Sequence, residues 1–430
     1  MTFRLRLGAM ALACCAAWPA AAQDAPPAVT PREAAAGNPA QRAFALSGPD
    51  QDLYQNALQS LAEGRKNDAS DTLSRLVEVE PLHAGAWLDL ALIQCSLGRA
   101  SEAERLFRAI ETRFDPPEGI LELIARTRAE GCMTWQPTSA GSINFGRGID
   151  RNVNQGASSA TYFAVQDGVI VERTLSSDFL PRHDQYTALS GEYLRDITPN
   201  GSIGFAQFQT RRNDSLHDYD SASLFVGVES PWRFKRWTLR ATGMLGFIGL
   251  GGHLYQRQAQ LQARIGPPLP LPESVQLSVL GGMTRTEYLT LTNFNTNTFE
   301  VRGQLSYGAR TRYASTSLGF LADKANTLRP GGDRTGWVMN ALLRESLTPD
   351  LTAEIGYTRQ GWQGESAYAP GTINETRKQN TQVLRFLLTR RMAKDHNLQL
   401  EMRAVRNREN ISIFQYNNRQ LQLSWVWLGL

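Results

Sequence analysis

The chain has 430 residues, a formal net charge of +4 and 42% hydrophobic residues. Such a small charge, which falls to +2 when a leader containing Arg4 and Arg6 is removed from the +4 chain, argues against nucleic acid as a partner. No run of eighteen apolar residues follows the amino-terminal segment, which excludes a transmembrane helix but not a barrel of strands with a polar interior.

The amino terminus predicts an exported protein. Residues 1–22 combine a basic start, an apolar stretch at 7–17 and an A-x-A site at 20–22, which is the pattern of a secretory signal peptide. Cleavage before Cys14, as in a lipoprotein, is the alternative, but alanine stands where a lipobox usually has leucine. Residues 23–46 are rich in Ala, Pro, Gln and Gly and predict a flexible leader.

Residues 47–133 predict a short tetratricopeptide-repeat domain. Small and apolar residues recur there at a spacing of 34, the period of that repeat. The recurring sets are Gly64 and Gly98; Ala57, Ala91 and Ala125; Ala69 and Ala103; and Leu73 and Phe107. We expect two helix pairs followed by a single helix over 117–129. Because so few repeats are only marginally stable on their own, we also expect this domain to pack against the rest of the chain.

The first helix of each pair should line the concave side of such an array. Its apolar residues there would be Tyr54, Leu58, Leu88 and Leu92. One interpretation is a groove that binds an extended peptide or an amphipathic helix of a client protein. The other is that these residues pack against the leader, the barrel or one another.

Two cysteines, Cys95 and Cys132, remain after removal of the signal peptide. Both fall near helix ends of neighbouring repeats, and the compartment of an exported protein is oxidising. A disulfide between them is one hypothesis, and two ordinary buried thiols are the other.

Residues 138–430 predict a transmembrane β-barrel. Leu421, Leu423, Trp425 and Trp427 alternate with mostly polar or small residues, and this period of two recurs from about Gly141 to the carboxyl terminus. The expected fold class is therefore an α plus all-β membrane protein, a periplasmic tetratricopeptide α-solenoid followed by a 14-stranded antiparallel barrel. The predicted strand cores are 141–149, 184–194, 201–209, 221–229, 234–246, 254–265, 274–284, 298–307, 311–321, 335–344, 350–359, 380–390, 397–405 and 419–429.

The connections between these strands differ in length by parity. The even-numbered ones are short, at 196–201, 230–233, 267–272, 308–309, 346–348 and 392–395. Most odd-numbered ones are longer, notably 150–183, 211–220, 285–297, 322–334, 360–379 and 406–418. Short periplasmic turns and long external loops are typical of outer-membrane barrels. This parity predicts a location in the outer membrane of a Gram-negative bacterium, with the repeats in the periplasm.

Polar residues on the inward positions are candidates for the lumen. They are Gln256, Gln258, Gln260, Glu300, Arg302, Glu354, Glu401 and Arg403. They would form either a polar conduit that engages a client or simply the polar interior that any barrel of this size has. The sequence contains no G-x-S-x-G, H-E-x-x-H, Walker A or C-x-x-C motif. We therefore expect no catalytic, cofactor or metal site, and no enzyme.

A short motif at the end of the first barrel strand resembles a known family. Asp150, Asn152, Val153 and Asn154 match the G-Y-D-S-N-V-N stretch that opens the barrel of the surface lipoprotein assembly modifiers, or Slam proteins, which are translocons of type XI secretion. Ile149 replaces an aromatic residue of that motif, and Arg151 replaces a small one. The order of signal peptide, short repeat domain and barrel is also similar. Asp and Asn favour turns, which is the simpler explanation of the motif.

The resemblance implies a translocon that moves a lipoprotein or a soluble secreted protein to the cell surface. It implies a secreted or lipidated client, handover from periplasmic chaperones, contact with outer-membrane lipid, and no cofactor. We expect a monomer. Two alternatives remain, an exopolysaccharide export porin with periplasmic tetratricopeptide repeats and a barrel that mainly scaffolds the envelope. A mixed lumen of Gln, Glu and Arg favours the translocon over the export of an anionic polymer.

Overall fold

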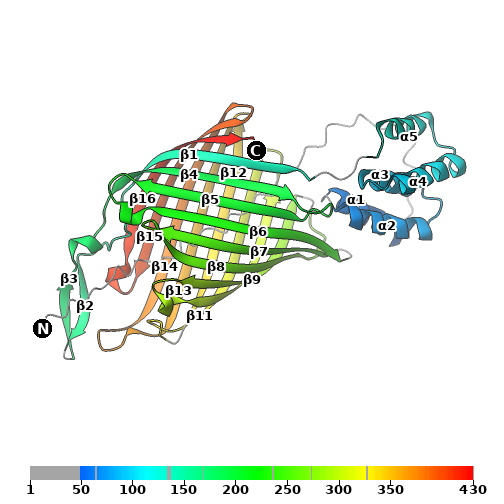
Figure 1. Ribbon diagram of the computed structural model, residues 1–430. Helices are drawn as coiled ribbons and strands as arrows, with labels where there is room; N and C mark the ends of the chain where they lie inside the picture. The colour runs from blue at the N-terminus through cyan, green and yellow to red at the C-terminus, as the bar shows by residue number, and fades with distance from the viewer. Residues whose placement is uncertain are drawn as a thin grey trace.

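The computed structural model describes residues 49–62, 65–132, 137–166, 168–234, 237–272, 274–325 and 328–429. It consists of five helices and a closed antiparallel barrel of fourteen strands (Figure 1), which confirms the barrel predicted from the alternating pattern. The predicted signal peptide, residues 1–22, and leader, residues 23–46, lie outside the described residues.

The helices form two antiparallel pairs and a final single helix. Helix α1 pairs with α2, α3 pairs with α4, and α2 packs against α3. Helix α5 ends at Gly131, whose φ of 74° places it in the left-handed region that favours glycine at a helix end. The helix bounds are α1 Pro49–Ala62, α2 Lys66–Val79, α3 Ala84–Ser96, α4 Ala100–Arg113 and α5 Glu118–Glu130.

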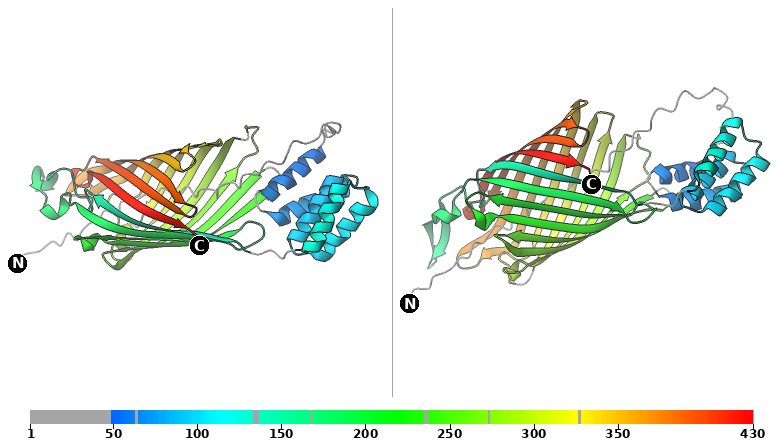
Figure 2. Two further views of the ribbon diagram at one scale, coloured as in Figure 1. Left: turned by 90° about the horizontal axis from the view of Figure 1, so that it is seen from above. Right: turned by 45° about the horizontal axis from the view of Figure 1, so that its top comes forward.

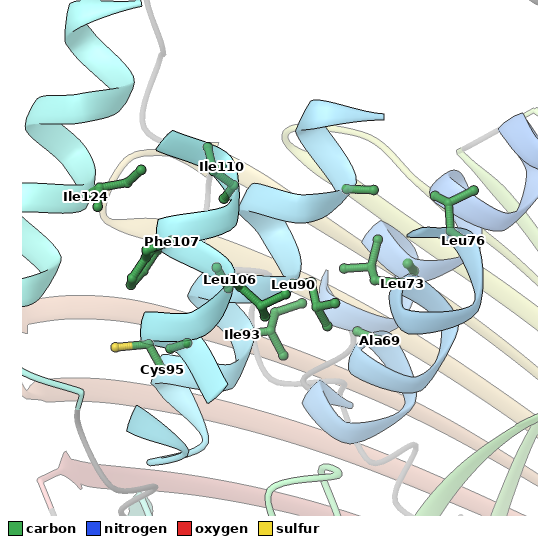
Figure 3. Close-up of a cluster of buried hydrophobic side chains, with 14 residues drawn as sticks. Ala69, Leu73, Leu76, Leu90, Ile93, Cys95, Leu106, Phe107, Ile110 and Ile124 are labelled. Carbon is green, nitrogen blue, oxygen red and sulfur yellow. The ribbon is translucent and has the colours of Figure 1, made fainter. Parts of the chain in front are cut away.

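A single apolar core holds the helices together. Ala69 and Ala103 are fully buried, and their small side chains let adjacent helices approach, while Leu73 and Phe107 fill the space between them (Figure 3). Helix α5 adds Ile124 to this core. It is also held by Arg128, whose guanidinium donates to Glu104 of α4 at 2.9 Å and to Glu111 at 2.6 Å. The hydrogen bonds from Arg128 hold the pKa of Glu104 below its usual value.

All fourteen predicted strands are present. The barrel strands are β1 Ser139–Asp150, β4 Asp184–Asp196, β5 Ile203–Asn213, β6 Ser221–Phe234, β7 Trp237–Leu250, β8 His253–Gly266, β9 Val275–Tyr288, β10 Thr296–Gly308, β11 Arg312–Ala325, β12 Arg334–Thr348, β13 Leu351–Ala369, β14 Ile373–Ala393, β15 His396–Glu409 and β16 Tyr416–Leu428. Each pairs with its neighbour in sequence, and β1 closes the barrel by pairing with both β4 and β16.

Three predicted connections need correction. The segment 230–233, predicted as a turn, belongs to β6, where Pro231 pairs with Arg240. The predicted loop 360–379 is largely strand, because β13 and β14 extend as a hairpin beyond the barrel wall. The predicted loop 150–183 contains a hairpin of β2 Thr161–Gln166 and β3 Val169–Thr174. Strands that lie outside the lipid layer need no apolar outward side. These segments therefore lack the alternation of apolar and polar residues on which the prediction rested.

The two faces of the barrel wall differ in polarity. On β16, the exposed fractions of Leu421, Leu423 and Trp425 are 39%, 51% and 45%, and the intervening positions face the interior. Exposed large apolar side chains follow the same alternation on the other strands, for example Phe299 and Val301 on β10. An apolar outer band around a polar interior is typical of a barrel that faces lipid. Among the described residues, none of the helices is long and apolar enough to cross a membrane.

The helices and the β2–β3 hairpin lie at opposite ends of the barrel, as Figures 1 and 2 show. We call these ends the helical end and the hairpin end. The chain leaves the last barrel strand at the helical end. The helices contact the barrel through Arg233 of β6, whose Nη2 donates to Asn56 Oδ1 at 3.0 Å, and through the backbone N–H of Asn67, which donates to Asn200 Oδ1 at 3.3 Å.

Candidate functional site

The predicted groove residues lie on α1 and α3, which are the first helices of the two helix pairs. Leu88 and Leu92 are half-buried and pack against the helical core, whereas Leu58 is 39% exposed. The Tyr54 hydroxyl donates to Asp89 Oδ2 at 2.6 Å, and its ring lies 4.7 Å from the His83 ring. Burial and this hydrogen bond raise the pKa of Tyr54, so its phenol stays protonated. Leu58 is therefore the most accessible of the four side chains.

The structure joins Cys95 and Cys132 by a disulfide, with their Cα atoms 4.5 Å apart. Cys95 lies near the end of α3 and is buried, and Cys132 follows α5. The bond therefore ties the end of the last helix to the middle of the domain.

The predicted lumen residues all lie on inward positions of the barrel wall. Gln256, Gln258 and Gln260 follow one another on β8, whose outward Leu261 is 68% exposed. Glu300 and Arg302 form an ion pair on β10. The remaining three are Glu354 on β13 and Glu401 and Arg403 on β15, and they belong to a larger group of charged residues.

That group is a ladder of alternating charges across four neighbouring strands. Arg344 of β12 donates to Glu354 Oε2 of β13 at 2.8 Å, and Arg385 of β14 donates to Glu354 Oε1 at 3.2 Å and to Glu401 Oε2 of β15 at 2.9 Å. Arg385 stands directly opposite Arg403, a like-charge pair that would be unfavourable alone. The two carboxylates offset this repulsion, so the interior wall is polar without a strong field of one sign.

The family-like motif lies at the hairpin end and organises the connection between β1 and β4. The side-chain amide of Asn152 is buried; it donates to the carbonyls of Gly156 at 3.0 Å and Asn417 at 2.9 Å, and its oxygen accepts from the Gly156 N–H at 2.7 Å. Asn154 donates to the carbonyls of Asp178 at 3.0 Å and Leu180 at 2.8 Å. Half-buried Val153 donates its backbone N–H to the carbonyl of Arg182 at 2.7 Å. The motif thus fastens both halves of the 151–183 connection to the barrel rim.

Asp150 belongs to the seam where β1 meets β16. It is 2% exposed, pairs with Arg211 at 2.8 Å, and accepts from Gln420 at 2.8 Å. The Arg211 guanidinium lies 3.8 Å from the centre of the Tyr186 ring, and the Tyr186 hydroxyl donates to Gln422 at 3.0 Å. A β-carbon at position 148 would lie 2.5 Å from that ring, so only glycine fits there. Tyr186 of β4 therefore reaches across β1 to β16, and Arg211 of β5 holds Asp150 of β1, which in turn accepts from Gln420 of β16; these contacts reinforce barrel closure.

Sequence reasoning missed both Arg211 and a second buried carboxylate, Asp323 of β11. Asp323 accepts from Arg329 at 2.8 Å, from Arg334 at 2.9 Å and from Thr298 at 2.9 Å. Its side chain has no exposed surface. An Asp at the end of a predicted strand gives no sign of burial, because its partners come from a separate loop and strand. Only a nearby pair of arginines in the sequence hinted at this cluster.

We expect Asn152→Ala to loosen the 151–183 connection. The substitution leaves the buried carbonyl and N–H of Gly156 and the part-buried carbonyl of Asn417 without their partner, at a cost of about 2 kcal/mol. Protease added to intact cells should then cleave within 155–180 faster than in the unsubstituted protein. Asn417→Ala is the matched control, because that exposed side chain makes a single 3.3 Å hydrogen bond to Ser158. Equal cleavage of the two variants would contradict the anchoring role of Asn152.

No protein-family model matches the chain, and no curated protein matches it in sequence. Solved structures similar to it include an anion-selective porin from Comamonas acidovorans, with 8% identity, a TM-score of 0.36 and coverage of 68% of this chain and 99% of that one. An outer-membrane channel from Pseudomonas putida F1 has 12% identity and a TM-score of 0.34 over 67% and 96% of the two chains. The channel DcaP of Acinetobacter baumannii has 8% identity and a TM-score of 0.36 over 68% and 97%. At these scores the barrel is best described from its own geometry.

The described residues include no group of three or more His, Cys, Asp or Glu side chains placed to hold a metal ion. The candidate site consists of an interior wall of paired charges, a fastened connection at the hairpin end and a set of helices at the other end.

Proposed function

We propose that this protein is an outer-membrane translocon that moves a lipoprotein or a secreted protein to the cell surface. The observation that carries the proposal is the contact between the helices and the barrel. Arg233, on an inward position of β6, bonds to Asn56 of α1 at 3.0 Å, so a helical binding domain is held beside the entrance of a polar interior. In this arrangement a client bound by the helices needs to travel only a short distance to the barrel.

The chemistry of both parts supports this proposal. The two helix pairs and final helix are consistent with tetratricopeptide repeats, whose first helices commonly bind peptides. The interior ladder of Arg344, Glu354, Arg385 and Glu401 pairs two arginines with two carboxylates. It offers hydrogen bonds to an unfolded backbone without the uniform positive charge that an anionic polymer would favour. The matching motif at Asp150 to Asn154 supports kinship with the surface lipoprotein assembly modifiers.

The orientation follows from the same features. We infer that the helical end faces the periplasm, where chaperones would deliver the client, and that the hairpin end faces outward. The strands join through the longer 151–183 connection at the hairpin end and through shorter turns at the helical end, as expected for an outer-membrane barrel. Folding of the client outside the cell would supply the driving force.

The test is surface display of a candidate lipoprotein or secreted client that is coexpressed with this protein. Deletion of residues 47–133 should abolish display while the barrel still assembles. A finer variant is Leu58→Glu, which places a carboxylate in an apolar contact and should reduce display about thirtyfold, because burying that charge costs on the order of 2 kcal/mol. Protease shaving of intact cells measures the displayed fraction.

Leu82→Glu is the matched control for the groove variant. Leu82 lies between α2 and α3 and is 87% exposed, so the same substitution there should leave display unchanged. Equal display with and without the full-length protein, at normal barrel levels, would rule out the translocon. Such a result would leave polysaccharide export or a scaffolding role as the better explanation.

A further inference from the structure

A group of basic side chains lies on the outer surface at the hairpin end. It comprises Lys378 of β14, Arg406 and Arg408 of β15, Arg419 of β16 and Arg151, just after β1, and we call it the basic patch. All five residues are exposed. They come from adjacent strands, which lie about 4.8 Å apart in a sheet, so the charges are close together.

The strand register places these residues beside one another. Arg419 pairs with Ala404, and Arg406, two residues further along β15, pairs with Asn417. The backbone N–H of Arg151 donates to the Arg419 carbonyl at 3.1 Å, which brings β1 to the same place. Arg408 pairs with Asn380, two residues from Lys378 on β14. The patch is therefore a continuous diagonal row across four strands.

The basic patch stands at the border of the apolar band. Arg419 shares the outward face of β16 with Leu421 and Leu423, which are 39% and 51% exposed. Met402 and Leu384 continue the band below Arg406 and are 46% and 50% exposed. A ligand bound here would meet cations at one end and an apolar wall directly beneath them.

No carboxylate of the described residues forms an ion pair with the basic patch. Two other outward cations at this end are paired: Arg285 with Glu287 at 2.7 Å and Lys324 with Asp333 at 2.6 Å. Two carboxylates adjacent to the patch in sequence point inward instead; Glu409 binds Arg377 at 2.7 Å, and Asp150 has its own interior partner. The exposed carboxylate of Glu375, three residues before Lys378, accepts from the side-chain amide of Asn410 at 3.0 Å. Five neighbouring cations thus repel one another until an external anion neutralises them.

We propose that the basic patch binds the bisphosphorylated headgroup of a glycolipid in the outer leaflet, the lipid A part of lipopolysaccharide. Arginine pairs with phosphate oxygens through two parallel N–H donors, and several arginines in a row match two phosphates on one headgroup. The acyl chains of the same lipid would cover Leu421, Leu423 and the apolar band below. This assignment rests on the proposed orientation, in which the hairpin end lies in the outer leaflet.

The experiment measures binding of lipid A to the purified full-length protein in a nonionic detergent. Arg406→Gln combined with Arg419→Gln should weaken binding at least about tenfold, since hydrogen bonds to charged groups are the strong ones. The matched control is Arg212→Gln combined with Arg257→Gln, which also removes two exposed outward cations, but from β5 and β8, three strands apart. That control should bind lipid A as the unsubstituted protein does.

The remaining arms decide between anions. Phosphatidylglycerol, with a single phosphate, should bind more weakly than lipid A, and millimolar inorganic phosphate should not displace it. Three results would overturn the proposal: an equal loss of affinity for lipid A in both double variants, equal binding of lipid A and phosphatidylglycerol, or displacement of lipid A by inorganic phosphate. If the first double variant fails to assemble, Lys378→Gln with Arg408→Gln tests the same patch. No client takes part in the measurement, so its outcome is independent of the display assay.

Discussion

Asp323→Ala is expected to lower the free energy of unfolding of the barrel by about 3 kcal/mol, because a buried ion pair that loses one partner leaves an uncompensated charge. The Asp323 carboxylate has no exposed surface, and the side chains that it neutralises, Arg329 and Arg334, are 5% and 20% exposed. Removing the carboxylate also leaves Thr298 without its acceptor at 2.9 Å. The unfolding midpoint in guanidinium, followed by tryptophan fluorescence in lipid vesicles, measures the change.

Asp333→Ala is the control for that variant. Asp333 lies in the same connection, and its side chain is 29% exposed and pairs with Lys324. An exposed pair of this kind contributes about 1 kcal/mol or less, so the control should shift the midpoint much less. Asp323→Asn, which keeps the shape but removes the charge, should fall between the two. A midpoint for Asp323→Ala equal to that of the control would show that the buried cluster is not stabilising.

Loss of the disulfide should destabilise the helical domain strongly. The bond closes a separation of 37 residues. On the chain-entropy model a loop of that length contributes about 3–4 kcal/mol. For a domain of this size, such a loss corresponds to a decrease in Tm of about 15 °C or more. Helix α5 depends on the bond most, because Ile124 is the only residue of that helix buried in the core.

The measurement is thermal unfolding of the full-length protein followed by far-UV circular dichroism, with and without reductant. Cys95→Ala combined with Cys132→Ala should unfold its helices at the temperature at which the reduced unsubstituted protein does. The barrel transition should not change in either case. An oxidised protein and a double variant with the same helical Tm would contradict a stabilising role for the bond.

The fourteen barrel strands were predictable because a wall between lipid and water requires a period of two. That requirement acts on each residue separately, so Leu421 and Leu423 indicate an outward face without knowledge of any partner. The same reasoning placed Gln256, Gln258 and Glu354 on inward positions. It failed for β2, β3 and the outer parts of β13 and β14, where the strands lie beyond the barrel wall and do not alternate between apolar and polar residues.

The sites themselves depend on residues far apart in the chain. Asn152 bonds to the carbonyl of Asn417, and Asp150 pairs with Arg211. The motif from 150 to 154 was recognisable as a turn-forming segment, yet its function as an anchor for a long connection follows only from these partners. The unpaired state of Arg406 and Arg419 is likewise invisible in sequence, because it depends on which carboxylates point inward.

The sequence by itself determined that the carboxy-terminal part is a barrel, which residues face outward and where most of the turns fall. These properties follow from local periodicity and from the different environments on the two sides of one wall. Tertiary structure alone decided the closure of β1 on β16, the burial of Asp323, the contact of Arg233 with α1 and the grouping of five cations beside the apolar band. These features arise from chain closure, which sets the register between distant strands and thereby decides which charges are neutralised and which remain free to bind a ligand.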